Sequence, residues 1–496
     1  MRDTVDSSGG LRRHHVVVVL TVAAVVVAAC QMALFQAPGG QPWFYAAVVA
    51  WTLVAVIVTV PLAMVTRWKA DLFAPTTWVF GLGFLEFVFR GGLLLASPAN
   101  FRFPQLLDDS GYYRSLAMAL FSGAIAYTAF AIGYYTFRRS GVRLRVPTRA
   151  ETRLLAKVAL VLLAASYVGY IMFVESLGGL SVLIGSLYQR NELLEGRHYE
   201  VALIRLAYVA PMLLLVAQIG ARSQQRWARI SLILVVVGCV LMATLGGRGR
   251  ALAPALGLLM MWHYFVRRMG LRHLAVVSIV LIVAANAILL VRQESRRASS
   301  VEELQTSVLE QYRDADLGEQ LTIFATARVP FQGLDGLMVL QERMPKELPF
   351  QWSLPLKAIV VFVPRALWPG KPAANPGSIF STTWLPANES AKSTGSVGTA
   401  FMMYGYLGIV VLFALNGRIL AWLYNTFRNN LRQPLVAVGY LLILTTARDV
   451  LIPPYENLLI HTVPLLAVGM LFVLLRGQRA PVPARPSAMA REGRTS

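Results

Sequence analysis

Two arginines lie among glycines in the stretch Gly246-Gly247-Arg248-Gly249-Arg250, which separates two apolar segments. Glycines allow backbone amides to approach an anion closely, and guanidinium groups bind phosphate oxygens through paired hydrogen bonds. The pattern therefore predicts a phosphate-binding turn that uses Arg248 and Arg250. An equally weighted alternative is a tight turn whose arginines extend to lipid headgroups.

Two further stretches place arginines near the ends of apolar segments. The first is Tyr188-Gln189-Arg190-Asn191, where Arg190 faces either lipid headgroups or a bound pyrophosphate. The second is Thr446-Ala447-Arg448-Asp449, whose Arg–Asp pair is either a plain ion pair or a functional one. Ionisable groups at membrane depth are costly, so they indicate function by default.

The stretch Val363–Pro372 contains three prolines, Arg365, Trp368 and Lys371. Prolines restrict the backbone and so fix the direction of the basic side chains. Trp368 fits either the headgroup level of a membrane or the face of a sugar ring. We interpret the stretch as a sugar or phosphate contact, with a rigid interfacial anchor as the alternative.

The sequence lacks the motifs of several common classes of enzyme and transporter. It has no GxxxxGK[ST] loop, no HExxH motif and no GxSxG motif, so it predicts neither nucleotide-driven transport nor a catalytic metal or cofactor. Its two cysteines, Cys30 and Cys239, both lie in apolar runs and exclude a disulfide framework. Asp314 and Asp316 have the spacing of a DxD motif, but we interpret them as part of the solvated face of a helix.

The composition indicates that the solvent of this chain is lipid. Of its 496 residues, 56% are hydrophobic and 14% are charged, against roughly 25% charged in soluble domains. The net charge of +21 is distributed between apolar segments, which is typical of topology signals rather than of nucleic-acid binding. We therefore expect no nucleic-acid partner.

Runs of about 20 apolar residues predict transmembrane helices. The sequence thus predicts an all-α, polytopic membrane protein with about twelve spans and one large extracytoplasmic loop. The expected spans cover residues 16–35, 44–65, 73–96, 115–136, 154–174, 201–220, 228–245, 251–266, 273–292, 402–424, 433–447 and 457–475. Ionisable residues inside or near these spans include Glu86, Arg90, Lys157, Arg205, Arg292 and Arg418.

Basic residues concentrate on alternate connections between the spans, as the positive-inside rule requires. This predicts a multi-pass protein of a bacterial-type inner (cytoplasmic) membrane with both termini in the cytoplasm. The expected parts are a cytoplasmic N-terminus (1–15), nine spans (16–293), an extracytoplasmic loop (294–399), three spans (400–476) and a disordered cytoplasmic tail (477–496).

Two local features remain open within this plan. The loop begins with an amphipathic helix expected at Val301–Leu321, and its aromatic content argues against disorder. The segment Val27–Cys30 also fits a lipoprotein cleavage site, although an ordinary first helix is favoured, so lipidation of Cys30 is undecided.

Four stretches resemble the Wzy-type O-antigen polymerases, which join oligosaccharide repeat units. They are Gly178-Gly179-Leu180 followed by Arg190, Leu245–Arg250, Val363–Pro372, and Ser393–Ser396 leading into Met403–Gly408. The likeness covers nearly the whole chain in architecture but only these segments in sequence. It implies a GT-C-like architecture and a glycosyltransferase that uses an undecaprenyl-type polyprenyl-pyrophosphate-linked glycan as donor for cell-envelope polysaccharide biosynthesis.

The resemblance implies that a growing glycan is transferred onto the end of another lipid-linked repeat unit. Clustered arginines would stabilise the charge that develops on the pyrophosphate leaving group without a metal. We expect Arg248, Arg250 and Arg448 to clamp the pyrophosphate, with Arg190, Arg365 and Lys371 contributing to substrate binding. Asp449 is the preferred catalytic base, and Asp335 and Glu456 are further candidates.

Other functions remain as alternatives. A ligase related to O-antigen ligases would move the glycan to a different acceptor, whereas a lipid-linked glycan flippase or other transporter would carry it across the membrane. The expected partners are the lipid-linked oligosaccharide, membrane lipids and, for a polymerase, a chain-length regulator and a flippase.

Overall fold

The computed structural model describes most of the residues between 40 and 452. The described ranges are 40–67, 71–108, 111–136, 141–145, 147–185, 197–220, 225–245, 248–266, 268–270, 333–361, 375–386, 394–431, 433–446 and 450–452, with isolated positions elsewhere. All regular elements in these ranges are helices, and no strand occurs among them. The predicted all-α class is confirmed for this part of the chain.

Six helical segments in the described ranges are long and apolar enough to cross a membrane. They are Pro42–Leu62, Pro75–Ala96, Tyr112–Thr136, Arg149–Ser176, Glu200–Ala217 and Gly395–Asn429. Each overlaps a span expected from the sequence, so the chain is compatible with a multi-pass membrane protein. The spans expected at 16–35, 273–292 and 457–475, and the helix expected at Val301–Leu321, lie outside the described residues except for isolated positions.

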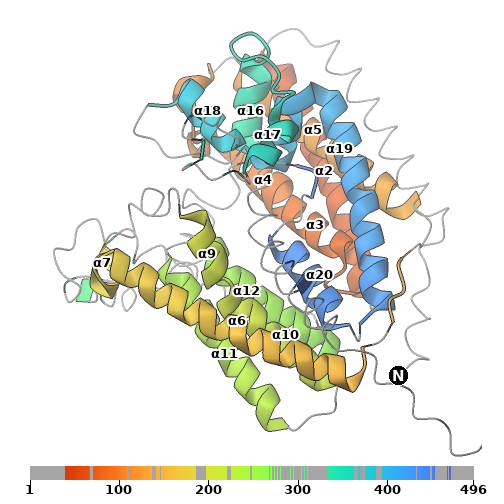
Figure 1. Cartoon of the computed structure of the whole chain (residues 1–496). Helices are drawn as coiled ribbons and strands as arrows, with labels where there is room; N and C mark the ends of the chain where they lie inside the picture. Colours follow the sequence, from red (N-terminus) through yellow and green to blue (C-terminus); the bar gives the residue numbers. More distant parts are fainter. Residues whose placement is uncertain are drawn as a thin grey trace, which may run out of the picture.

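The helices pack into two bundles with separate hydrophobic cores (Figure 1). The first bundle is built mainly from long helices, with three short helices gathered near one end. Its elements are α2 (Gly40–Arg67), α3 (Pro75–Gly83), η1 (Phe84–Phe89), α4 (Arg90–Ala96), η2 (Pro98–Asn100), η3 (Pro104–Leu106), α5 (Tyr112–Thr136), α16 (Gly333–Arg343), α17 (Leu354–Val361), α18 (Pro376–Trp384) and α19 (Gly395–Asn429).

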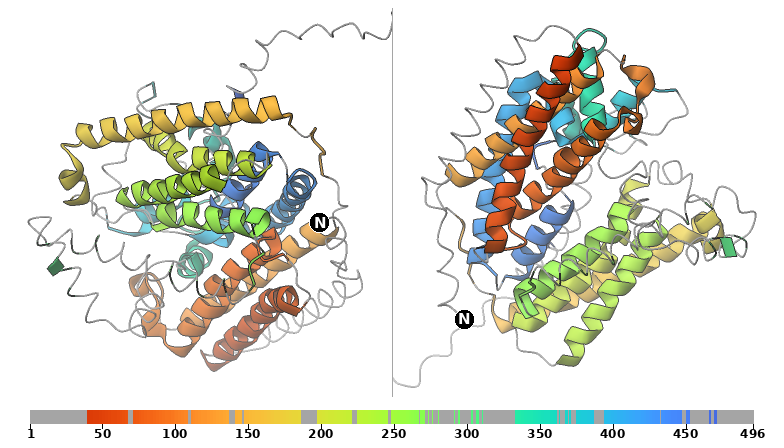
Figure 2. Two further views of the ribbon diagram at one scale, coloured as in Figure 1. Left: turned by 90° about the horizontal axis from the view of Figure 1, so that it is seen from below. Right: turned by 180° about the vertical axis from the view of Figure 1, so that it is seen from behind.

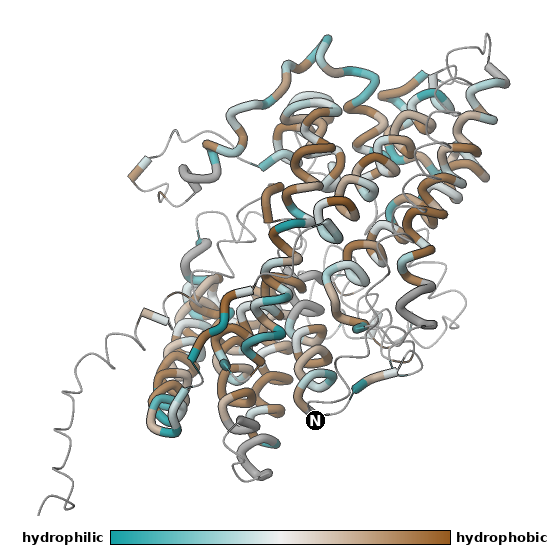
Figure 3. The backbone as a smooth tube through the Cα atoms, turned by 90° about the vertical axis from the view of Figure 1, so that its right-hand side faces the viewer, coloured by the Kyte–Doolittle hydropathy of each residue, from teal (hydrophilic) through white to brown (hydrophobic). Residues whose placement is uncertain are grey.

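The second bundle contains the middle of the chain and one helix from its C-terminal part. Its elements are α6 (Arg149–Ser176), α7 (Leu180–Gly185), α9 (His198–Ile204), α10 (Leu206–Gly220), α11 (Gln225–Thr244), α12 (Arg248–Met261), η5 (Trp262–Val266) and α20 (Pro434–Thr446). The left view of Figure 2 shows that α6 runs along an edge of the molecule. In Figure 3 the helical tubes are mostly apolar along their lengths.

Close contact between α5 and α19 holds the first bundle together. A Cβ atom on Gly133 would collide with the carbonyl of Ala414, and one on Gly417 would collide with the carbonyl of Phe130. Small residues at such positions allow two helix backbones to approach, which is how helices commonly associate in membranes. These glycines therefore set the spacing of the pair.

Three helical segments, two of them among the six that could span a membrane, depart from regular α-helical geometry. The elements η1 and η5 are π-helical turns, and each contains a buried ionisable residue, Glu86 and His263 respectively. Helix α19 is kinked at Tyr404 and Gly405, where Gly405 has a φ of 63°. Single π-helical turns occur frequently at functional sites.

Connections expected on the same side of the membrane contact one another. At one end, the Phe103 and Phe380 rings lie 5.4 Å apart, although the sequence places them in different outside loops. At the other end, the Leu144 amide donates to the Asn430 side chain at 2.6 Å. Each of these two contacts thus joins connections that the sequence places on the same side of the membrane.

Candidate functional site

The residues predicted to bind or transform substrate are only partly described. Arg248 and Arg250 belong to the first turn of α12, a 14-residue helix. The backbone N–H groups of a first helical turn have no partners within the helix, and they form a positive end that favours anions. The other predicted site residues, Arg190, Arg365, Lys371, Arg448 and Asp449, lie outside the described residues, so their roles stay predictions.

The glycines Gly178 and Gly179 follow the end of α6, both with positive φ angles. Nearby, the Arg197 guanidinium donates to the Ser176 hydroxyl at 2.6 Å and lies 5.6 Å from the centre of the Phe173 ring. The start of α9 is therefore attached to the end of α6. The Tyr170 and Thr244 hydroxyls, 2.8 Å apart, link α6 to the end of α11 in the same way, shortly before α12 begins.

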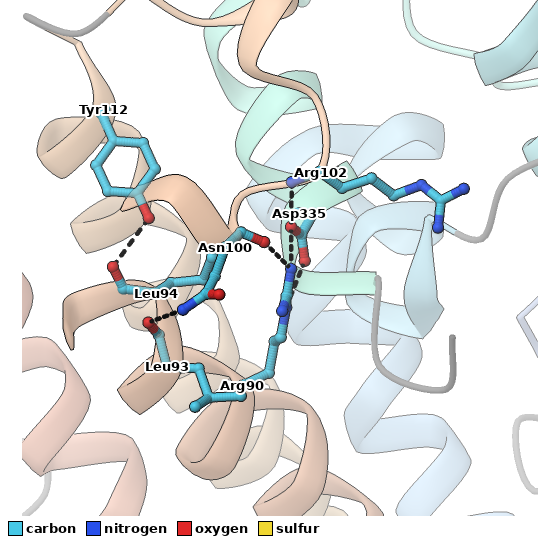
Figure 4. A network of polar contacts seen from close by, with 7 residues as sticks. All are labelled: Arg90, Leu93, Leu94, Asn100, Arg102, Tyr112 and Asp335. Carbon is cyan, nitrogen blue, oxygen red and sulfur yellow. Dashed lines mark hydrogen bonds and ion pairs between the residues drawn. The ribbon is translucent and has the colours of Figure 1, made fainter. Parts of the chain in front are cut away.

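A charged network joins the end of the η1–α4 segment to α16 (Figure 4). Arg90 donates to both carboxylate oxygens of Asp335, from Nη2 at 2.7 Å and from Nε at 3.0 Å. Its Nη2 also donates to the Asn100 carbonyl at 2.7 Å, and the Arg102 amide donates to Asp335 Oδ1 at 3.1 Å. Asn100 in turn donates to the Leu93 carbonyl at 3.2 Å. The network fixes the connection after α4 against α16.

Asp335 was a candidate base, but its geometry fits a structural role better. Its side chain is 0% exposed and accepts three N–H groups, two of them from a guanidinium. Proton transfer to this carboxylate would have to displace those donors. Because Asp335 is fully buried and held by Arg90, it has no access to a substrate hydroxyl in this arrangement.

A second buried carboxylate, Glu86, lies one helical turn before Arg90. It is 7% exposed, and its Oε1 occupies the space next to the Cα atoms of Gly333 and Gly395. These glycines are the first residues of α16 and α19. Carboxylates are stabilised at helix N-termini by the positive end of the helix dipole. Glu86 therefore joins the beginnings of two helices that are distant in sequence.

Polar side chains also line the contact of α16 with α5 and α19. The Gln341 amide nitrogen donates to the Ser122 hydroxyl at 2.6 Å and reaches the Tyr406 hydroxyl at 3.4 Å. The Ser115 hydroxyl donates to Glu342 at 3.0 Å. The Gln341 amide oxygen is buried without a protein partner, and such groups are normally satisfied by water.

Just beyond α16, Glu347 accepts hydrogen bonds from the Trp384 indole at 2.7 Å and from Arg343 at 2.9 Å. The Trp384 hydrogen bond is the main cause that lowers the pKa of Glu347, and Arg343 contributes in the same direction. Trp384 ends α18, so Glu347 connects two short helices of the large loop. This connection stabilises the ionised carboxylate.

At the opposite end of the molecule, Asp71 connects the two bundles. The hydroxyls of Tyr264 and Tyr424 both donate to Asp71 Oδ2 at 2.7 Å. The Phe73 amide donates to Oδ1 at 3.0 Å, and His263 Nε2 lies 3.6 Å from the same oxygen. One carboxylate thus holds the connection before α3, the η5 turn and the C-terminal half of α19.

The hydrogen bonds around His263 determine its protonation state. The Met269 amide donates to His263 Nδ1 at 3.0 Å, so this nitrogen must be unprotonated. The proton of the neutral ring is then on Nε2, which faces Asp71. A second proton on His263 would break the Met269 hydrogen bond.

The sequence predicted only some of the residues in these clusters. Glu86 and Arg90 were expected as ionisable residues inside a span, but their partners were not predicted. Asp71, Tyr264 and Tyr424 were not singled out at all. The available signal was an acidic residue, Asp71, close to Arg67 and Lys69 in a connection that the sequence places on the cytoplasmic side.

The clusters are not metal sites. Among the described residues, no group of three or more His, Cys, Asp and Glu side chains is arranged to hold a metal ion. The Asp71 cluster supplies one carboxylate and one imidazole, and its remaining members are phenols. What it can do is accept and exchange protons within a hydrogen-bonded network.

The comparisons with known proteins identify the family and nothing further. No curated protein and no solved structure matches the chain. Residues 113–430 match the model of the domain of unknown function DUF8712. The match begins in α5 and ends directly after α19, so it includes Asp335, His263 and Tyr424 but not Asp71 or Arg90. Because the match covers more than half of the chain, this protein belongs to the DUF8712 family.

Proposed function

We propose that this protein is a glycosyltransferase of the inner membrane that joins polyprenyl-pyrophosphate-linked repeat units into a polysaccharide at the outer membrane face. The observation that carries the proposal is the start of α12, where Arg248 and Arg250 form part of the first helical turn. Two guanidinium groups together with free backbone amides suit a pyrophosphate. The stretch is also one of the four that resemble the Wzy-type polymerases.

The chemistry of the reaction explains why arginines are needed. When the bond between the anomeric carbon and its oxygen breaks, negative charge develops on the lipid pyrophosphate. Fixed positive groups stabilise that charge in the transition state. Arg248, Arg250 and Arg448 form the proposed clamp, and Asp449 removes the proton from the acceptor hydroxyl.

The proposal includes a finer membrane arrangement. About twelve spans in a GT-C-like architecture place both termini in the cytoplasm and residues 294–399 outside. Residues 333–350 and 375–386, from that loop, pack at one end of the first bundle, together with the connection after α4. A packed loop of this kind suits binding of an extended glycan better than a flexible linker does.

Transport is the second candidate function, and the Asp71 cluster favours it. Buried acids paired with histidine are typical of proton relays in membrane transporters. A flippase for lipid-linked glycans would use such a group for proton coupling. A ligase remains a third candidate, because it shares the donor and the pyrophosphate leaving group.

The deciding experiment removes the protein from its host and separates lipid-linked glycans by length. Loss of a polymerase leaves single repeat units at the outer face and no long chains. Loss of a flippase leaves the units at the inner face, and loss of a ligase leaves long chains attached to the lipid. Either of the last two patterns would contradict polymerisation.

Point variants test the clamp. We expect Arg248→Ala and Arg250→Ala to stop chain growth at normal protein levels, since each removes a bidentate donor. Lysine at the same positions should restore growth only partly, because it lacks the planar fork. Arg229→Ala at the opposite end of the neighbouring helix α11 is the matched control. Normal chain lengths in both alanine variants would exclude the assignment.

A further inference from the structure

The beginning of α6 carries a stripe of cations on its exposed face. Arg149, Arg153 and Lys157 are spaced four residues apart and are all exposed. At this spacing they lie on the same face of the helix. None of the three makes an ion pair with another described residue, so their charge is available to an outside partner.

The same face of α6 becomes apolar immediately after Lys157. Leu160, Val161, Val168 and Met172 continue the exposed stripe, and Val161 and Met172 are more than 60% exposed, at 63% and 65%. Exposed aliphatic residues along an outer helix of a membrane protein face lipid. The change from cations to aliphatic residues therefore marks the edge of the hydrocarbon layer on this helix.

The length of α6 agrees with this position. Its 28 residues extend about 42 Å at 1.5 Å per residue, whereas the hydrocarbon core is roughly 30 Å thick. The helix is long enough for its first turns to reach the headgroup layer. Arg149 and Arg153 then lie at the level of lipid phosphates, and Lys157 can extend its chain toward them.

An ordered segment next to α6 adds two more cations. In residues 141–145, exposed Arg143 and Arg145 alternate with exposed Val142 and Leu144. The segment is held in place by Asn430, whose amide nitrogen donates to the Val142 carbonyl at 2.6 Å and whose oxygen accepts from the Leu144 amide at 2.6 Å. Exposed aliphatic residues that alternate with arginines suit the boundary between headgroups and acyl chains.

A cavity lies between this segment and the starts of α6 and α20. It measures about 90 Å³ and is lined by Arg145, Thr152 and Gln433, among others, which is more space than a single water needs. Glu151 also borders it, but its carboxylate is engaged with the Thr148 amide at 2.8 Å as part of a capping box. The Thr152 hydroxyl already donates to the Thr148 carbonyl at 2.9 Å, so the cavity offers the Arg145 guanidinium and the Gln433 amide to a polar group.

We propose that Arg143, Arg145, Arg149, Arg153 and Lys157 form a binding site for the headgroup of an anionic phospholipid of the inner leaflet. The phosphate lies between the segment 141–145 and the first turns of α6, and the acyl chains follow the aliphatic face of α6. Clusters of four or more basic residues beside a span have this specificity. The site is independent of the glycan chemistry at the opposite end.

The test compares lipid dependence in the full-length protein. Purified protein is placed in nanodiscs of phosphatidylcholine with increasing phosphatidylglycerol, and its thermal unfolding is followed. Retained lipids are identified by native mass spectrometry. We expect phosphatidylglycerol to raise the unfolding temperature and to be retained in preference to phosphatidylcholine, with both effects weakened by salt.

Variants assign the effect to these residues. Each basic residue near an anionic surface contributes about fivefold in affinity, so the triple variant R145Q/R149Q/R153Q should bind phosphatidylglycerol roughly 100-fold more weakly. The lysine variant R145K/R149K/R153K keeps the charge and should stay within about tenfold of the native protein. The control R102Q/R114Q/K346Q removes the same charge at the other end and should leave the lipid dependence unchanged.

Three results would overturn the proposal. One is an undiminished phosphatidylglycerol dependence in R145Q/R149Q/R153Q. Another is equal retention of phosphatidylcholine and phosphatidylglycerol by the native protein, which remains measurable if the triple variant fails to fold. The third is the same stabilisation by inorganic phosphate in neutral nanodiscs, which would indicate a site for a soluble anion.

Discussion

Two carboxylates, the buried Asp335 and the partly exposed Asp71, organise opposite ends of this protein in different ways. Asp335 is 0% exposed and binds the guanidinium of Arg90 through two hydrogen bonds. Asp71 is 21% exposed and accepts from two tyrosine hydroxyls and a backbone amide, and its Oδ1 lies 3.6 Å from Nε2 of a neutral histidine. At the first site a negative charge pairs with a positive one. At the second site a single negative charge accepts hydrogen bonds from neutral donors.

The two sites also differ in what they connect. Arg90 and Asp335 belong to the same bundle and fix the connection after α4 against α16. Asp71, Tyr264 and Tyr424 come from three segments, and the hydrophobic residues next to them belong to the core of the second bundle. The charged pair thus stabilises one bundle internally, whereas the Asp71 cluster stabilises the contact between bundles.

This difference indicates which of the two sites can open when the molecule changes shape. Breaking a buried charge pair leaves an unpaired charge at high cost, so the Arg90 site has one stable arrangement. Neutral donors around a partly exposed carboxylate can be replaced by water at lower cost. Movement of one bundle relative to the other is therefore expected to begin at Asp71.

The largest effect is expected from removal of Asp335. Asp335→Ala leaves Arg90 buried without its counterion and should lower the free energy of unfolding by about 3–5 kcal/mol. Unfolding of the purified protein in detergent measures the loss, and Asp108→Ala, at an exposed carboxylate, is the control. A loss below that of Asp71→Ala would reverse the comparison.

Asp71→Ala should have the next largest effect, about 2–3 kcal/mol, because three donors lose a shared acceptor. The loss of stability should be confined to the junction of the two bundles. Proteolysis should become faster in the connections between the bundles, while the contact of α5 with α19 stays protected. Cleavage that is uniform along the chain would show that Asp71 does not act at the junction.

Removal of single hydroxyls should have smaller effects. Tyr424→Phe and Tyr264→Phe each delete one hydrogen bond to Asp71, and each should lower the free energy of unfolding by about 1.5 kcal/mol. In a double-mutant cycle with Asp71→Ala, the two phenylalanine substitutions should add almost nothing further. Full additivity would mean that the tyrosines stabilise the fold independently of Asp71.

The smallest effect concerns Glu347, a carboxylate near the Arg90 end that is paired but largely exposed. Its pKa is lowered by Trp384 and Arg343, so its contribution to stability is complete above the unfolded pKa and is lost as the pH falls through the folded one. Unfolding measured between about pH 6 and pH 3 should therefore depend slightly less on pH in Glu347→Gln. An unchanged pH profile in this variant would show that the pair contributes nothing.

Sequence patterns located the helices well but their ends less well. The segment Pro75–Ala96 is helical where a span was expected at 73–96, despite Glu86 and Arg90 inside it. Helix α19 starts at Gly395 rather than near 402. The polar residues at this start gave no helix signal, and the Glu86 carboxylate that lies beside Gly395 is far away in the chain.

The functional prediction depends on residues of two kinds. Arg248 and Arg250 were identified by type and spacing alone, but they lie in the first turn of α12, which begins three residues before the expected span, and not in a turn between spans. Asp335 was considered as a base because an acid in an outer loop is formally available for proton transfer. Only its contact with Arg90, 245 residues away, indicates a structural role.

The sequence by itself determined that the described part of this protein is helical and that several of its helices are long and apolar enough to cross a membrane. These properties follow from local hydropathy along the chain. Tertiary structure alone decided which buried charges meet, since Arg90 with Asp335 and Asp71 with Tyr264 and Tyr424 come from distant segments. Such pairs are selected by the packing of helices, and packing leaves no signature in the composition of any one segment.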